Sequence, residues 1–144
     1  IKQKSFSSPH EMALVNILFT SNWLRDKQKE YFYPYDLKPQ HFNVLRILKG
    51  KYPDASCPGD IKDVMLDKSP DLTRLIDKMI KMGLVERNVC QENRRKVDVI
   101  ITEKGLSIVD DISEQLNTMY AASKSKLSEK EAQTLSELLD KMRF

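Results

Sequence analysis

The sequence predicts a mainly helical fold that carries one small β-hairpin. Glycine and proline are scarce, with 4 and 6 of the 144 residues. Apolar residues recur at helical spacing over most of the chain, and one short region alternates apolar and polar residues beside a polar turn. Hydrophobic residues make up 40% and charged residues 31% of the chain, the balance of an ordinary globular domain. Residues 1–144 are therefore expected to form a single domain with its own core.

The first half of the chain is predicted to contain three helices. The stretch 8–11, Ser-Pro-His-Glu, is typical of a helix start: a serine cap, a proline at the first helical position and a glutamate that returns its side chain to the cap. This helix is expected to reach residue 30, and an aromatic connection with two prolines follows at 31–39. The second helix is expected to end at Gly50. One face of a short third helix is formed by Ile61, Val64 and Met65.

The clearest helical pattern comes next. Ser69 and Pro70 repeat the cap-plus-proline signal, and Gly83 marks the end of the helix. Between them the apolar residues fall at the spacing i, i+3, i+4, i+7, i+8. They are Leu72, Leu75, Ile76, Met79 and Ile80.

The remaining segments predict a hairpin and two terminal helices. The stretches 84–90 and 96–102 read as short strands on either side of a polar turn. Helical periodicity resumes at Thr102 and runs to about Tyr120. The signal Ser-x-x-Glu at 128–131 then caps a last amphipathic helix.

The order of these elements is that of a winged helix-turn-helix: two short helices joined by a tight turn, then a hairpin with a cationic tip. In that arrangement the second helix enters the DNA major groove with its N-terminal residues at the base edges. Arginine binds guanine with two hydrogen bonds, and hydroxyl groups bind phosphates or bases. Opposite its apolar stripe, the predicted second helix carries the donors Ser69, Thr73, Arg74 and Lys78.

Three consecutive cations, Arg94, Arg95 and Lys96, lie in the predicted turn of the hairpin. A hairpin in this position reaches the phosphate backbone or the adjacent minor groove, whose narrow, negative form attracts arginine. A solvated turn is the alternative interpretation for a run of charge. The flanking motif favours contact with DNA.

The stretch LTRLIDKMIKMGLVERNVCQENRRKVDVIITEKG resembles the signature of the MarR (multiple-antibiotic-resistance) regulators. This chain departs from the family pattern at Asn93, where aspartate is usual, and at Lys38, where a threonine or serine cap is commoner. With Asn93, the ion pair that braces the family's wing would become a weaker amide contact. The family's recognition helix, Gly-Leu-Val-x-Arg strand, Asp-x-Arg wing and Thr-x-x-Gly helix start correspond to residues 72–79, 83–87, 93–95 and 102–105.

The resemblance implies an obligate homodimer in which the first helix and the last two helices interleave. The sequence supports a dimer independently, because the terminal helices have more apolar faces than one winged domain can cover. The predicted winged helix-turn-helix region is 38–104, and the predicted dimerisation helices are 8–30 and 105–144. The residues predicted to bind DNA are Lys68, Ser69, Asp71, Thr73, Arg74, Lys78, Arg87, Asn93, Arg94, Arg95 and Lys96.

The sequence offers two further kinds of candidate site. Aromatic walls with a few polar groups suit small phenolic ligands, although an ordinary aromatic core is the alternative. Cys57 and Cys90 could sense oxidants, with incidental thiols as the alternative. No metal or cofactor is predicted, since the histidines and cysteines lack metal-ligand spacing. The residues of the predicted pocket for an aromatic effector are Phe19, Trp23, Tyr31, Phe32, Tyr33 and His41.

The predicted function is that of a sequence-specific repressor that binds double-stranded DNA as a homodimer on a pseudo-palindromic operator and is released by a small aromatic ligand. A winged-helix module that binds protein and a cysteine-based redox regulator remain as alternatives. The net charge of +3 permits an anionic partner without requiring one. No enzyme motif is found, and no apolar run is long enough for a membrane span. We expect the protein in a bacterial or archaeal cytoplasm, on the nucleoid when bound.

Overall fold

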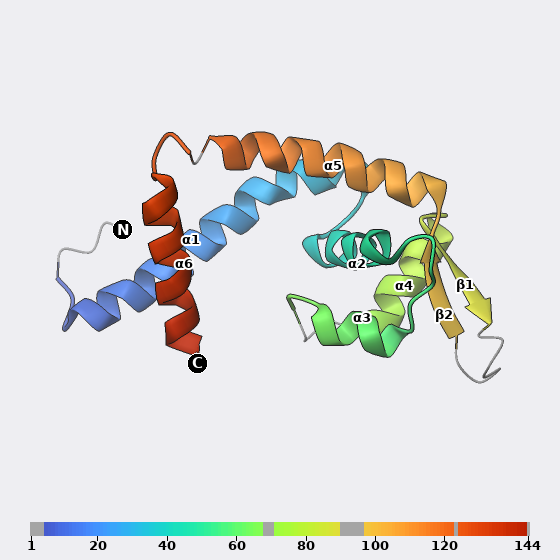
Figure 1. Cartoon of the computed structure of the whole chain (residues 1–144), viewed down its shortest axis with the longest axis horizontal. Coiled ribbons are helices and arrows are strands. Elements are labelled where there is room, and N and C mark those ends of the chain that lie inside the picture. Colours follow the sequence, from blue (N-terminus) through green and yellow to red (C-terminus); the bar gives the residue numbers. More distant parts are fainter. Residues whose placement is uncertain (1–4, 68–70, 90–96, 123, 144) are drawn as a thin grey trace. The chain divides into compact units, whose positions relative to one another are not determined.

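The computed structural model describes residues 5–67, 71–89, 97–122 and 124–143. The chain divides into two compact units, residues 1–110 and 111–144, and the division falls within the fifth helix. The described elements confirm the predicted mainly helical fold with a β-hairpin (Figure 1). They are α1 (Pro9–Phe32), the 3-10 helix η1 (Tyr33–Tyr35), α2 (Pro39–Lys51), α3 (Pro58–Val64), α4 (Leu72–Lys81), β1 (Val85–Val89), β2 (Val97–Ile101), α5 (Glu103–Ala121) and α6 (Glu129–Arg143).

Serine caps begin the first and last helices, as predicted. In α1 the Ser8 hydroxyl accepts a hydrogen bond from the Glu11 N–H at 3.1 Å. The Glu11 carboxylate, however, accepts from the N–H and hydroxyl of Ser7, at 2.6 and 2.7 Å, and not from the cap residue itself. In α6 the box closes as expected: Ser128 donates to the Glu131 carboxylate at 2.9 and 2.7 Å, and the Glu131 N–H donates back at 3.4 Å.

Two predicted helix boundaries were wrong. Helix α2 does not stop at Gly50 but continues to Lys51. Its end is set by Pro53, because the residue before a proline is disfavoured in helical conformation, and Tyr52 accordingly has ψ 137°. Helix α4 begins at Leu72, and its cap is Asp71, whose side chain accepts from the Arg74 N–H at 3.3 Å. The predicted cap at 69–70 lies outside the described residues.

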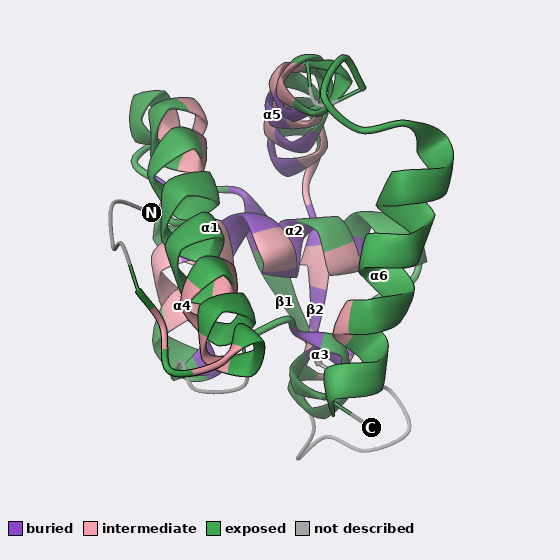
Figure 2. Cartoon of the chain, turned by 90° about the vertical axis from the view of Figure 1, so that its left-hand side faces the viewer, coloured by how far each residue is buried: buried purple, intermediate pink, exposed green. Residues whose placement is uncertain are grey.

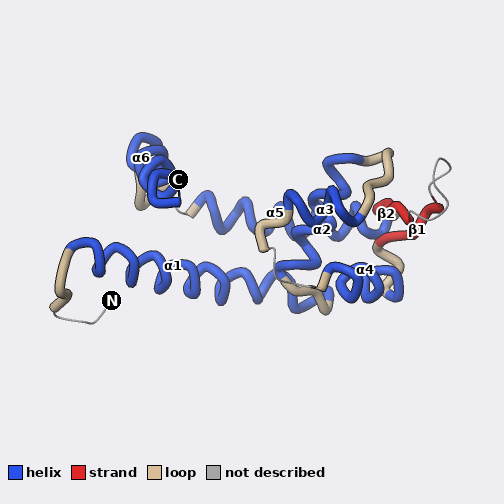
Figure 3. The backbone as a smooth tube through the Cα atoms, turned by 90° about the horizontal axis from the view of Figure 1, so that it is seen from below, coloured by secondary structure: helices blue, strands red, loops and turns tan. Residues whose placement is uncertain are grey.

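The end of α4 is fixed by Gly83, as predicted. This glycine has φ +71°, in the left-handed region that residues with a Cβ atom rarely adopt. The Leu84 N–H donates to the Met79 carbonyl and the Gly83 N–H to the Ile80 carbonyl, both at 2.9 Å. These paired bonds form a Schellman motif, so α4 turns sharply into the hairpin that follows it (Figure 3).

The core of the first unit lies between α2, α3, α4 and the hairpin. Figure 2 shows the buried positions on α2 and on the strands, whereas α1 and α6 are mainly exposed. Val64, which was placed on the apolar face of the third predicted helix, is 61% exposed. The chain leaves α3 with extended backbone at Met65, and this side chain is the buried one. Fully buried side chains in this core include Val44, Leu45, Leu48, Ile61, Met79, Leu84, Val85 and Val99.

The hairpin pairs in antiparallel register, from Val85 opposite Ile101 to the last pair before the turn. Ser56, in the loop before α3, adds a short bridge to this sheet by exchanging two backbone hydrogen bonds with Val99, at 2.9 and 2.8 Å. At the base of the hairpin the Thr102 hydroxyl donates to the Gly83 carbonyl at 2.8 Å. The hairpin is therefore tied both to the α2–α3 connection and to the end of α4.

Candidate nucleic-acid interface

Helix α4 has one buried face and one exposed polar face. Leu72, Ile76 and Met79 are buried, whereas Thr73 and Arg74 are exposed in the first turn. This is the arrangement that the sequence predicted, with donors on the side opposite the apolar stripe. The N-terminal end of α4 therefore offers a hydroxyl and a guanidinium group to solvent, at the position from which a recognition helix reads DNA.

The Asp71 carboxylate contacts both the backbone and the side chain of Arg74. One carboxylate oxygen caps α4 through the Arg74 N–H, and the other lies 3.1 Å from Arg74 Nε. The Arg74 side chain is 88% exposed. Because Asp71 engages the inner nitrogen, the two terminal nitrogens of the guanidinium are the ones suited to the paired acceptors of a guanine edge. Asp71 thus lies against Arg74 and restrains its side chain, and direct contact of Asp71 with DNA stays a prediction.

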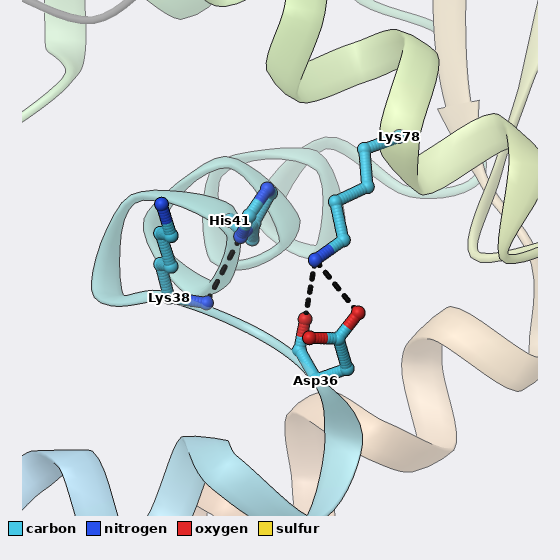
Figure 4. Close-up of polar contacts among 4 residues, drawn as sticks. All are labelled: Asp36, Lys38, His41 and Lys78. Atoms are coloured by element: carbon cyan, nitrogen blue, oxygen red, sulfur yellow. Dashed lines mark hydrogen bonds and ion pairs between the residues drawn. The ribbon is translucent and has the colours of Figure 1, made fainter.

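Lys78 lies at the margin of the polar face and points to the α1–α2 connection. Its Nζ donates to the Asp36 carbonyl at 2.8 Å and lies 2.8 Å from the Asp36 carboxylate (Figure 4). The same ion pair lowers the pKa of the Asp36 carboxyl below its usual value. Of the predicted DNA-binding residues in α4, Lys78 is thus the one engaged with a distant part of the chain.

Arg87 on β1 reaches back to α4. Its Nη2 lies 2.5 Å from the Asp77 carboxylate. Both side chains are about half exposed, at 48% and 45%. The pair joins the first strand of the hairpin to the middle of α4. No signal in the sequence marked Asp77 as a partner of Arg87, since the two residues lie on different elements.

The predicted contacts Lys68, Ser69 and Asn93 to Lys96 lie outside the described residues. The last described strand pair is Val89 with Val97, so residues 90–96 join the two strands. Contact of this tip with DNA stays a prediction.

The six residues predicted for an aromatic pocket have different environments. Phe32 and His41 are buried, and Phe32 packs on Phe42 with ring centroids 5.3 Å apart. Trp23 and Tyr33 are 46% and 85% exposed. Phe19 is likewise exposed, and Tyr31 is half-buried. The contact described among these aromatic rings is therefore one of ordinary packing, and the effector pocket stays a prediction.

Cys57 has a local structural role. It precedes α3, and its sulfur accepts a hydrogen bond from the Asp60 N–H at 3.4 Å. Cys90 lies outside the described residues, so the redox alternative stays a prediction. Within the described ranges, no three His, Cys, Asp or Glu side chains are grouped as metal ligands. No described helix is long and apolar enough to cross a membrane.

Comparison with known proteins identifies the family. Residues 37–105 match a family described as winged helix DNA-binding domain. The HTH-type transcriptional regulator MhqR of Bacillus subtilis (strain 168) is 29% identical over 121 residues, covering 83% of this chain and 81% of that protein.

Solved structures agree with this assignment. A MarR transcription factor from Planctomyces limnophilus is 30% identical, with a TM-score of 0.71 over 94% of this chain and 98% of that one. Mutant MarR from E. coli complexed with operator DNA is 26% identical, with a TM-score of 0.77 over 96% and 99%. The chain therefore belongs to the MarR family and is a winged-helix, DNA-binding transcription regulator.

Proposed function

We propose that this regulator is a homodimeric repressor that reads a pseudo-palindromic operator with α4 and grips the flanking DNA with the hairpin tip. The observation that carries the proposal is the exposed first turn of α4, where Thr73 and Arg74 stand opposite a buried apolar face. Arg74 is assigned to a guanine edge and Thr73 to a phosphate or base. Arg95 and Lys96 are assigned to phosphates or the minor groove.

The roles assigned to α4 are tested by comparing the binding of cognate and altered DNA. Operator fragments are first captured from the protein's own genome and then used in fluorescence anisotropy titrations. Arg74→Ala should cost about 1–3 kcal/mol on the cognate site and relax sequence choice at one position in each half-site. The control is Arg143→Ala, which removes an arginine at the far end of α6. Equal loss on every sequence would show that Arg74 contacts phosphate and does not read a base.

The dimer is supported by exposed apolar side chains on both terminal helices. On α6, Leu135, Leu138 and Met142 lie on one face and are 47%, 54% and 53% exposed. Monomeric proteins rarely leave such a continuous apolar stripe in water, and a symmetric copy would cover it. On α1 the exposed apolar side chains are Met12, Leu14, Leu18, Phe19, Trp23 and Leu24.

Light scattering tests the dimer. The wild-type chain should have the mass of two chains, and Leu138→Asp should shift it to one because a charge cannot be buried at that interface. Gln133→Asp is the matched control, since it places the same residue on the opposite face of α6 and should leave the dimer intact. A monomeric wild-type protein with full helicity would exclude the interleaved arrangement.

Release by an aromatic ligand is the third part of the proposal. Such a ligand must bind the DNA-competent and DNA-incompetent dimers with different affinity, or it shifts nothing. Trp23 supplies the readout, because it is the single tryptophan of the chain. A panel of phenols and aromatic acids should include compounds that quench its fluorescence and release DNA together. If no compound does either, the effector hypothesis should be abandoned.

A further inference from the structure

We propose that Lys78 positions the recognition helix rather than contacting DNA, and that it does so by fixing α4 to the α1–α2 connection through Asp36. The inference rests on the proposed function in one respect, since it takes α4 to be the helix that reads DNA. It changes the role that the sequence suggested for Lys78.

The contact is made by one amine and two oxygens of the same residue. Lys78 Nζ donates to the Asp36 carbonyl oxygen at 2.8 Å and lies 2.8 Å from its carboxylate (Figure 4). Asp36 has φ 51° and ψ 34°, a left-handed conformation in which non-glycine residues are uncommon and aspartate is among the better tolerated. Two of the three N–H donors of Lys78 Nζ are used by these oxygens, which leaves at most one for a phosphate.

The connection that receives Lys78 is itself firmly held. The Asp36 N–H donates to the Tyr33 carbonyl at 3.1 Å, and the Leu37 N–H donates to the Phe32 carbonyl at 3.2 Å. Leu37 is only 6% exposed. These hydrogen bonds hold the connection against the end of α1. Lys78 therefore contacts a segment whose position follows that of α1.

The first turn of α2 fastens the other end of the connection. The Lys38 N–H donates to His41 Nδ1 at 2.9 Å, which requires that this nitrogen be unprotonated. Burial, followed by the charges of Lys78 and Lys38, lowers the pKa of His41 to about 4. His41 is therefore neutral at physiological pH and accepts this bond. Hydrogen bonds thus hold both ends of the segment from Asp36 to His41 in place.

Exposure separates Lys78 from the residues assigned to reading DNA. Its side chain is 36% exposed, whereas that of Arg74 is 88% exposed. The neighbouring residue Asp77 joins α4 to β1 through its ion pair with Arg87. These two contacts add to the buried apolar face in fixing the orientation of α4. The Asp36 contact makes that orientation depend on the position of the C-terminal end of α1. A change in the position of α1 within a dimer would therefore also move α4, through the Lys78–Asp36 contact.

The test compares Lys78→Gln, Asp36→Asn and the double variant. Asparagine keeps the backbone carbonyl and tolerates the left-handed conformation, so it removes only the charge. Each single variant should weaken cognate binding by roughly three- to tenfold, with the larger loss for Lys78→Gln, which also gives up the bond to the backbone carbonyl. The double variant should be no worse than Lys78→Gln, because that substitution already removes the whole contact. The slope of log affinity against log salt should stay unchanged. When the operator spacer is changed by one base pair, the wild-type protein should lose affinity. The variants should lose less, because their recognition helices are held less firmly at one spacing.

A matched control is the ion pair of Lys29 with Asp26 on α1, with N–O 2.6 Å. Lys29→Gln and Asp26→Asn should leave DNA affinity and spacing preference unchanged. Circular dichroism and thermal unfolding confirm that each variant is folded, and Lys78→Arg, which retains a cation for Asp36, should recover most of the affinity.

Two results would overturn the proposal. If Lys78→Gln lowers the salt slope by roughly 0.9 per contact, twice in a dimer, while Asp36→Asn leaves or raises affinity, then Lys78 binds phosphate. If neither variant changes affinity or spacing, the pair is only a surface ion pair. Failure of the proposed function is a separate result, because the wild-type protein itself would then show no salt-dependent DNA binding.

Discussion

Gly105→Ala should destabilise the protein through one backbone contact. Gly105 is buried in the first turn of α5. A Cβ atom there would lie closer than 3.0 Å to the carbonyl oxygen of Leu84 and 2.7 Å from Cγ1 of Ile101. The collision with Leu84 is the severe one, because a backbone carbonyl cannot rotate away as a side chain can.

Leu84 cannot shift without disturbing α4 and the hairpin, the elements that carry the proposed DNA contacts. Its carbonyl accepts from the Thr102 N–H at 3.1 Å, and its N–H donates to the Met79 carbonyl at 2.9 Å. The side chain is fully buried. A displaced Leu84 would therefore disturb the end of α4 and the base of the hairpin together.

The expected loss follows from two opposing effects. Overpacking that forces side chains and backbone to shift costs about 1–3 kcal/mol, occasionally more, and alanine in a helix returns up to about 1 kcal/mol. The net loss should be about 2 kcal/mol, which lowers the melting temperature by roughly 4–8 °C in a domain of this size.

Thermal unfolding followed by circular dichroism measures the loss. All variants are compared at one protein concentration, since the stability of a dimer depends on it. The matched control is Gly50→Ala, where a Cβ meets nothing within 4 Å and the helix should gain up to about 1 kcal/mol. If Gly105→Ala melts as high as Gly50→Ala, the close approach of Leu84 imposes no constraint and this reasoning is wrong.

Three further predictions concern charge. Arg95→Ala or Lys96→Ala should weaken binding to cognate and random DNA alike and lower the slope of log affinity against log salt by roughly 0.9 per phosphate contact. If the affinity and the slope stay unchanged in titrations, these cations belong to a solvated turn. Asp71→Asn should strengthen random-DNA binding and reduce discrimination by Arg74, measured as the cognate-to-random affinity ratio. His41 has its pKa lowered from 6.5 to about 4, so stability should fall by up to roughly 3 kcal/mol as pH drops through that window, in denaturant titrations, and His41→Gln should lose this dependence.

The sequence by itself determined the order of the elements and several of their ends. Gly83 could be read as a helix stop because only its immediate neighbours complete the Schellman motif. Ser8 and the box at 128–131 were likewise read correctly, since a cap bonds within the next turn. The face of α4 that carries Thr73 and Arg74 followed from helical periodicity alone. These are local signals, and each is satisfied within a few residues.

Only the tertiary structure decided which charged residues are engaged with one another. Lys78 and Asp36 are 42 residues apart, and Arg87 meets Asp77 across two elements, so periodicity gave no sign of either pair. Met65 rather than Val64 is buried because the core continues past the end of α3. The physical reason is the same in each case: side-chain direction at a helix margin is set by the element packed against it, and that element is remote in the chain.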